Sequence, residues 1–341
     1  MAKNIYRVSD GVMIYAEDTA WGTAGTPAGT SYVDRVQSFS ATVENNPIFS
    51  QGIGDGLNAK NVMNGPADVS GSMTWELTDP SFLQYGFLGT KSGGGTAADP
   101  YEIAEASALG YAAGEVNTLT LECGLEGATE DTMAYDGVFF ESVTINCNSG
   151  EKIMVNASWT GRNAVASTTN ETYTGPTNRP FTFVDGAVTV GSDTVGELMN
   201  FSITCNTEYK KSRDLSRFLM QPVAIRRRYT FSGTIRLHFD DTASTLSGTE
   251  LRNHIFNGTS TGTSIIDTAE NTTVAISMDL TEGAEVDDRV LAFDLETGYL
   301  SNFTQPIELD SGDIEVSFNG VALAGLTDST ANVAIRWYTL A

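Results

Sequence analysis

Residues 69–77 read VSGSMTWEL, and residues 231–239 read FSGTIRLHF, 162 positions further along the chain. The same offset relates VQSFSATVEN at 36–45 to LMNFSITCNT at 198–207. Five of these 19 aligned positions are identical, whereas unrelated sequences at ordinary residue frequencies would share about one. We therefore expect a β-rich unit that occurs twice and holds two similar surfaces at a fixed spacing.

The polar and apolar residues of these segments alternate with period two. In 68–77 the odd positions are Val, Gly, Met, Trp and Leu, while the even positions are polar or acidic, and 229–240 follows the same rule. This pattern is typical of a half-buried antiparallel sheet with one polar face. It predicts an all-β fold, with short helices at most around 80–88 and 246–257.

The length of 341 residues suits two domains of about 150 residues each. We expect a first domain at 1–163, including an N-terminal arm at 1–30, and a second at 181–341. Residues 164–180 are rich in Thr, Asn and Pro and are the predicted linker. The last hairpin of each copy is aligned through Trp159 and Trp337.

The composition is strongly acidic, with 43 acids against 19 bases and a net charge of −24. Such a chain lacks the broad basic surface that wraps nucleic acid, and it repels polyanions. The three Cys residues have no CxxC spacing and read as buried free thiols. No apolar run is long enough for a membrane span, and MAKNIYRVSDG lacks the apolar region of a signal peptide, so we expect synthesis in a cytoplasm.

The sequence offers little for catalysis or metal binding. Its two His residues, His238 and His254, have no companions at metal-ligand or triad spacing. Acidic pairs such as Asp240-Asp241 are what 43 acids produce by chance, although a β-fold glycosidase stays open as a weaker alternative. We expect no catalytic residue, no metal and no cofactor, and predict a protein that is not an enzyme.

Two loops of 22 residues, 46–67 and 208–229, separate the paired strands. A hairpin needs two to five residues, and longer loops are usually functional or disordered. Both keep apolar residues, and the second holds seven of the 19 bases. The acidic surface of another copy is the favoured partner, because no aromatic set for stacking nucleic acid bases accompanies these cations. The predicted subunit-interface residues are Ile48, Phe49, Ile53, Leu57, Lys60, Met63, Lys210, Lys211, Arg213, Arg217, Phe218, Arg226, Arg227 and Arg228.

Three features together resemble the tail tube proteins of long-tailed viruses. They are GVMIYAEDTAWGTAGTPAGTSYVDRVQSFSATVENN at 11–46, ADVSGSMTWELTDPSFLQYGFLGT at 67–90, and the F-S-x-T and S-G-[ST] strands of the second copy. The resemblance implies two tandem tube-type β-sandwich or barrel domains, each with a long inter-strand loop and a short flanking helix. It also implies trimeric, pseudo-sixfold rings stacked into a tube, with the long loops making the contacts between rings.

What the resemblance implies for function is a conduit in the virion tail, assembled in the host cytoplasm, through which double-stranded DNA passes without specific binding. The other expected partners are tail completion, tail tip and tape measure proteins, and no membrane. An acidic channel would repel phosphate. The candidate lumen-facing residues are Asp68, Ser70, Ser72, Thr74, Glu76, Thr230, Ser232, Thr234, Arg236 and His238, of which the last two depart from an acidic lining. The alternative from another class is a two-domain β-sandwich adhesin or carbohydrate-binding module.

Overall fold

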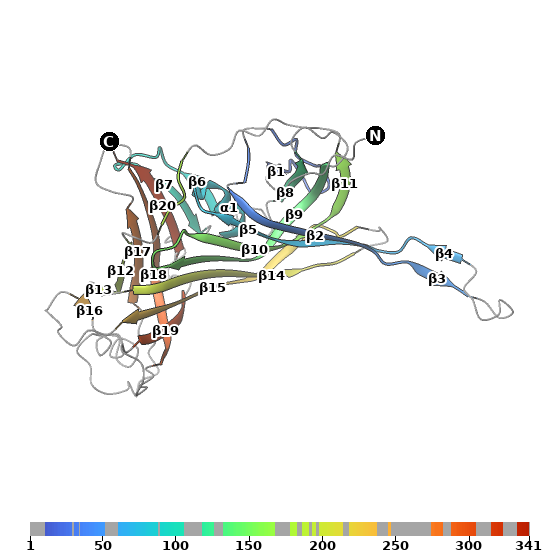
Figure 1. Ribbon diagram of the computed structural model, residues 1–341. Coiled ribbons are helices and arrows are strands. Elements are labelled where there is room, and N and C mark those ends of the chain that lie inside the picture. Colours follow the sequence, from blue (N-terminus) through green and yellow to red (C-terminus); the bar gives the residue numbers. More distant parts are fainter. Residues whose placement is uncertain are drawn as a thin grey trace, which may run out of the picture.

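The chain is built almost entirely from antiparallel β-strands, which confirms the all-β fold class (Figure 1). The computed structural model describes residues 11–28, 31–33, 35–51, 61–87, 89–105, 118–125, 132–167, 178–182, 186–190, 193–195, 198–213, 218–236, 245–246, 274–281, 288–304, 315–322 and 333–340. The helix expected around 80–88 is present as a 3₁₀ turn, η2 (Pro80–Phe82), followed by α1 (Leu83–Phe87). The second expected helix, around 246–257, lies outside the described residues except for Leu246, which belongs to the two-residue strand β16 (Thr245–Leu246).

Eight strands form one continuous antiparallel sheet, which we call the inner sheet. In spatial order they are β2 (Val36–Asn45), β5 (Ala67–Glu76), β10 (Met154–Gly161), β9 (Thr132–Asn148), β14 (Leu198–Lys210), β15 (Val223–Arg236), β19 (Glu315–Ala322) and β18 (Arg289–Thr304). The β9–β14 pair joins the two halves of the chain. The connection between β9 and β10 is short because it contains Gly150, whose φ of 76° suits a tight turn.

The long strands β9 and β18 each leave the inner sheet and enter a second layer. The first part of β9 pairs with β8 (Leu119–Leu125) and β11 (Asn163–Ser167), and β8 pairs in turn with β1 (Gly11–Glu17). The first part of β18 pairs with β17 (Val274–Thr281) and β20 (Val333–Thr339), and β17 pairs with β12 (Gly186–Val190) and through it with β13 (Asp193–Val195). Where β9 changes layer, Gly137 has a φ of 62°, and its N–H donates to Asp18 Oδ2 at 3.1 Å.

The strands of the two halves of the chain pair in the same spatial order. The inner-sheet series β2-β5-β10-β9 answers to β14-β15-β19-β18, and the second-layer series β1-β8-β9-β11 answers to β12-β17-β18-β20. The register corrects one detail of the sequence alignment. Trp159 lies opposite Gly71 and Phe318 lies opposite Gly233, so the counterpart of Trp159 is Phe318, and Trp337 lies in β20 of the second layer.

This register explains why the S-G-[ST] motif occurs twice. A Cβ atom on Gly71 would lie 2.2 Å from the Ser40 carbonyl oxygen and 2.4 Å from the Trp159 ring. On Gly233 it would lie 2.5 Å from the Phe318 ring and 3.0 Å from the Asn200 carbonyl oxygen. Each glycine therefore leaves the space that one buried aromatic ring fills.

Gly71→Ala should destabilise the protein by about 1–3 kcal/mol, the usual cost of overpacking a well-packed core. The ring and the Ser40 backbone would have to move apart, and the backbone belongs to the paired strand. Urea unfolding measures the loss, and Ser70→Ala, on the opposite and exposed face of β5, is the matched control with little expected change. A Gly71→Ala chain as stable as the wild type would show that the fit is loose.

The two halves of the chain share more contacts than two separate domains with the predicted limits would. The strands β6 (Gly89–Ser92) and β7 (Tyr101–Glu105) come from the first half of the sequence, yet β7 pairs with β20. Arg336 joins the two halves there, with Nε 2.6 Å from Glu102 Oε2 and Nη1 2.6 Å from Asp294 Oδ2. The predicted linker begins inside β11, which pairs with β9, and the predicted N-terminal arm contains β1.

Candidate assembly surfaces

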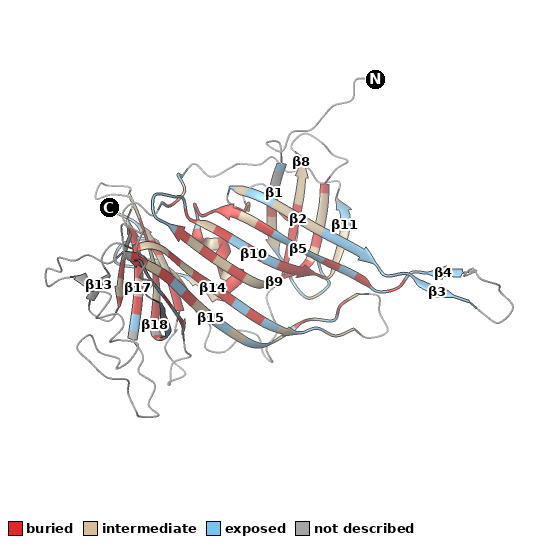
Figure 2. Ribbon diagram, turned by 60° about the horizontal axis from the view of Figure 1, so that its bottom comes forward, coloured by how far each residue is buried: buried red, intermediate tan, exposed pale blue. Residues whose placement is uncertain are grey.

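One face of the inner sheet is polar, and the other is the core. Figure 2 shows buried positions alternating with intermediate or exposed ones along β5, β9, β10, β14 and β15. The apolar side carries the largest fully buried side chains, among them Trp75, Trp159 and Phe231. We call the other side the polar strip and define it by Ser38, Ser40, Thr42, Ser70, Ser72, Thr74, Ser142, Thr144, Asn146, Asn156, Ser158, Thr160, Ser202, Thr204, Asn206, Thr230, Ser232 and Thr234.

Hydroxyl and amide groups of the polar strip bond to one another across the strands. Thr144 and Thr204 share a hydrogen bond of 2.9 Å across the junction of the two halves, and Ser202 and Ser232 share one of 2.8 Å. Thr74 Oγ1 donates to Asn156 Oδ1 at 2.8 Å. The strip thus presents neutral hydroxyl and amide groups, without the aromatic platform that a carbohydrate-binding module uses.

The charges expected on this face lie elsewhere. Glu76 is only 5% exposed, because it accepts from Lys152 Nζ at 2.6 Å and from Gln37 Nε2 at 3.1 Å. Asp68 is exposed at the end of β5, where it pairs with Arg213. The side chain of Arg236 and the whole of His238 lie outside the described residues. The excess negative charge predicted for a channel lining is therefore absent from the middle of this face, within the described part of the chain.

The free edge of β2 has an incompletely covered apolar row. Val36, Phe39 and Ala41 are half-buried and Val43 is 52% exposed. Their counterparts on β14, which are Leu198, Phe201, Ile203 and Cys205, are all buried. The difference has a simple cause: β9 lies beyond β14, whereas β2 pairs with β5 and with no other strand of the described residues.

The first long loop forms a projecting hairpin, which from here on we call the arm and which is separate from the N-terminal arm predicted at 1–30. It consists of β3 (Ile48–Ser50) and β4 (Asn61–Met63) and extends beyond the ends of β2 and β5 (Figure 1). Its apolar side chains are exposed, with Phe49 and Val62 each at 63%. Of the predicted interface residues in this loop, Ile48, Phe49 and Met63 are placed on the arm, while Ile53, Leu57 and Lys60 lie outside the described residues.

The second long loop packs against its own chain. Trp21 Nε1 donates to the Leu219 carbonyl oxygen at 3.2 Å, and the Arg162 guanidinium lies 5.1 Å from the Phe218 ring centre. Leu219 is buried, at 8% exposure. Neither Trp21 nor Arg162 was predicted from the sequence, because both are remote from the loop along the chain.

Most of the basic residues in this loop also have partners within the chain. Lys211 pairs with Glu141, Arg213 with Asp68, and Arg226 Nη2 with Glu208 Oε2 at 2.7 Å. Arg227 Nη1 donates to the Phe87 carbonyl oxygen at 3.2 Å. Lys210 and Arg228 are exposed, and Arg217 lies outside the described residues. The acids expected on another copy are thus largely supplied by the chain itself.

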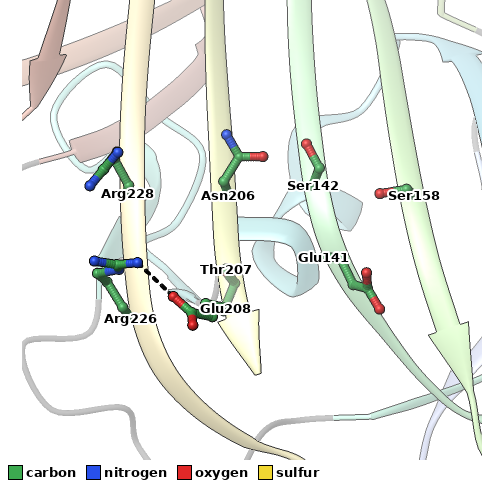
Figure 3. Close-up of a pocket in the computed structure, with 8 residues that line it drawn as sticks. All are labelled: Glu141, Ser142, Ser158, Asn206, Thr207, Glu208, Arg226 and Arg228. Carbon is green, nitrogen blue, oxygen red and sulfur yellow. Dashed lines mark hydrogen bonds and ion pairs between the residues drawn. The ribbon is translucent and has the colours of Figure 1, made fainter. Parts of the chain in front are cut away.

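A pocket of about 390 Å³ opens where β10, β9, β14 and β15 meet the second loop (Figure 3). Its lining residues are Glu141, Ser142, Ser158, Asn206, Thr207, Glu208, Arg226 and Arg228. Two of these residues, Arg226 and Glu208, form an ion pair, which is the dashed line in Figure 3. The pocket is an open end of the polar strip in which Glu141, Glu208 and Arg226 are in ion pairs. Its lining has neither a nucleophile–base pair nor a His.

Burial acts to raise the pKa of Glu141, but hydrogen bonds from Lys211 and Thr160 outweigh it and hold that pKa below its usual range. A lowered carboxyl pKa stabilises the folded state above the ordinary Glu pKa of about 4.3, and this contribution is lost as the pH falls through the lower folded value. We therefore expect wild type to melt higher than Glu141→Gln at pH 7, and the difference to shrink towards pH 3.5. Melting curves across this range measure it. An equal difference at both pH values would contradict the contact.

Catalysis and metal binding find no support in the described part of the chain. No group of three or more His, Cys, Asp or Glu side chains there is arranged to hold a metal ion. All three Cys residues are free thiols, and Cys147 and Cys205 are buried as predicted, whereas Cys123 is half-buried. Among the described helices, none has the length and apolar character required to cross a membrane.

The family of the chain is decided by its match to a family model. Residues 9–331 match the model described as phage tail tube protein. The chain belongs to the phage tail tube protein family. No curated protein matches it.

Membership of the tail tube family confirms the resemblance seen in the sequence and identifies a structural component of the phage tail. It also accounts for the surfaces described above. A tail tube protein self-associates, and the open β2 edge and the exposed arm are the apolar surfaces described above that this chain leaves uncovered.

Proposed function

We propose that three copies of this chain close into a ring with pseudo-sixfold symmetry, and that stacked rings form the hollow tail tube through which double-stranded viral DNA passes to the host. The observation that carries the proposal is the β2 edge. Val43 is 52% exposed, whereas Cys205, 162 positions on, is 1% exposed because the first half of the chain covers it. A preceding copy would cover β2 in the same way that β9 covers β14.

The β9–β14 junction supplies the register for this contact. Ser142 lies opposite Asn206 at the junction. In the second half of the chain the counterpart of Ser142 is Thr304, because Ser142 pairs with Ser158 as Thr304 pairs with Ser317. The counterpart of Asn206 in the first half is Glu44. Thr304 of one copy should therefore lie opposite Glu44 of the next, and both side chains are exposed in the single chain.

Ring closure would also remove the two free edges of the inner sheet. Each copy contributes eight strands, so three copies would supply 24 strands to one closed barrel. Free strand edges are templates for uncontrolled pairing, and closure removes them altogether. The chain then acts as two tandem tube domains, with limits near those predicted from the sequence, apart from the exchange of β6 and β7.

The polar strip is the surface that we assign to the channel. Ser, Thr and Asn side chains hold water and carry no charge that could bind phosphate, and the net charge of −24 per copy repels DNA at longer range. Passage without sticking requires no catalytic residue and no cofactor. The tube ends would meet tail completion and tail tip proteins, the tape measure protein would occupy the channel during assembly, and assembly would take place in the host cytoplasm.

Electron microscopy of the purified protein across a concentration series tests the proposal. We expect hollow stacked rings whose averages show threefold or pseudo-sixfold symmetry. Val43→Lys is the control, because a charge on the open edge of β2 should keep the chain monomeric without unfolding it. Wild-type monomers at every concentration would refute the proposed function.

A further inference from the structure

The two long loops occupy equivalent positions in the sequence but have different environments. The arm carries four large apolar side chains, Ile48, Phe49, Val62 and Met63, each exposed by half or more. Its six described residues include no charged side chain. The second loop also exposes apolar side chains, Met220 at 44%, Val223 at 38% and Ile225 at 61%. Its other contacts, however, are with Trp21, Arg162, Glu141 and Asp68, which all come from the first half of the same chain.

We call Trp21, Arg162, Glu141 and Asp68 the seat of the second loop, and the sequence of the second half does not repeat these four residues at the equivalent positions. The counterpart of Asp68 in the second half is Thr230, and Glu141 is the extra residue of a β-bulge in β9 that β18 does not have at that position. Arg162 alone separates β10 from β11, whereas residues 323–332 separate β19 from β20. The segment that follows β12, GSDTVGE at 191–197, has no aromatic residue to replace Trp21.

The two loops also differ in the residues that would bind to such a seat. The residues that correspond to Lys211 and Arg213 are Phe49 and Gln51. The first loop thus lacks the cations that dock the second, and the second half lacks the acids that would receive them. In the proposed ring the arm would lie beside the second half of a neighbouring copy, whose sequence does not repeat these four residues. We therefore expect the arm to extend away from its own ring.

The net charge of the chain indicates which part of one copy can approach another copy most easily. Copies with a net charge of −24 repel one another. The segment 48–63 contains one acid, Asp55, and one base, Lys60, so a hairpin without net charge approaches another copy at a small electrostatic cost. Exposed apolar side chains of this size gain most from burial against a second surface. The partner that a tube supplies at this position is a copy in the next ring.

We propose that the second loop is a clasp that locks the two halves of one chain together, and that of the two loops only the arm makes the contact between rings. Each ring then displays three arms and not six. This inference rests on the proposed function, since arms join rings only if rings form. It departs from the family expectation that both loops make such contacts.

Two variants separate the roles. In the arm variant, Phe49→Ser and Val62→Ser remove exposed apolar surface, so the monomer should melt within about 1 °C of wild type. Trimers should still form, but stacked tubes should be lost. In the clasp variant, Lys211→Ala and Arg213→Ala remove two ion pairs inside the chain, so the melting temperature should fall by about 2–4 °C. Any rings that this variant forms should still stack.

The measurements are melting curves, sedimentation for trimers, and electron microscopy for tubes and for ring averages. Three protrusions per wild-type ring are expected. Six equal protrusions, an arm variant that stacks normally, or a clasp variant with an unchanged melt that forms rings but cannot stack them would each overturn the inference while the ring proposal stands. Wild-type protein that never forms rings would overturn both, and melting of the clasp variant would then report only on the fold.

Discussion

A chain carrying Glu44→Cys and Thr304→Cys should give a covalent closed trimer when assembled rings are treated with a short bis-maleimide. The expected product on a denaturing gel has three times the chain mass, with the dimer as its precursor. The reason is the register of the β9–β14 junction, which places these two positions opposite each other on neighbouring copies. Directly opposed residues of antiparallel strands have Cβ atoms roughly 4.5–5.5 Å apart, within reach of such a reagent.

The chain contains its own positive control. Ser142→Cys with Asn206→Cys occupies the same relative position inside one copy, so it should cross-link at monomer mass at any concentration. Cys123 is half-buried and is replaced by Ser in every variant, while Cys147 and Cys205 are buried and stay unreactive.

A wrong-register pair tests the specificity of the contact. Ser38 is exposed on the same strand as Glu44 but six residues away, about 20 Å along an extended chain. Ser38→Cys with Thr304→Cys should therefore give no trimer. Equal yields from the two pairs would show that the copies meet without this register, and no cross-link from either would place the contact elsewhere.

The repeat and its alternation were predictable because they are local properties of the strands. The offset of 162 aligned β2 with β14 and β5 with β15, and the register later explained the shared Gly71 and Gly233. The alternation also identified the polar faces of β5 and β15. It failed for Glu76, because Lys152, 76 positions away, pairs with that carboxylate and covers it, while the lysine side chain itself stays 54% exposed.

The different environments of the two loops could not be read from their own residues. Phe49 and Phe218 look alike as apolar residues of long loops, and the sequence predicted the same interface for both. What separates them is the seat formed by Trp21 and Arg162, which lie far from Phe218 in the sequence and meet it only in the fold. The pairing of β7 with β20 was missed for the same reason, since Tyr101 and Trp337 are 236 positions apart and meet with ring centres at 5.4 Å.

The second large effect concerns the channel. Ser70→Lys with Ser232→Lys should leave tubes intact but stall the release of DNA from virions that carry the variant. Ser70 and Ser232 are equivalent, exposed positions of the polar strip, so each trimeric ring would gain a belt of six lysines. Their side chains point away from the core, and exposed substitutions change stability little.

The stall should depend on salt, and this dependence separates phosphate binding from a general defect. A site with six to ten phosphate contacts loses roughly 10³–10⁵ in affinity between 50 and 200 mM salt, so release should recover as salt rises. Ser70→Gln with Ser232→Gln adds similar length without charge and should release DNA at the wild-type rate at every salt concentration.

The outcome also decides which property of the wall allows passage. The polar strip is neutral, so in the wild type the DNA would meet hydroxyl and amide groups that bond to water and to one another, as Thr144 and Thr204 do at 2.9 Å. If neutrality at the wall is sufficient, six added cations per ring are enough to hold the DNA, although the chain as a whole remains strongly acidic. Unchanged release at low salt would mean that this face does not meet the DNA, and the opposite surface of the inner sheet is core, so the channel would have to be formed by another part of the assembly.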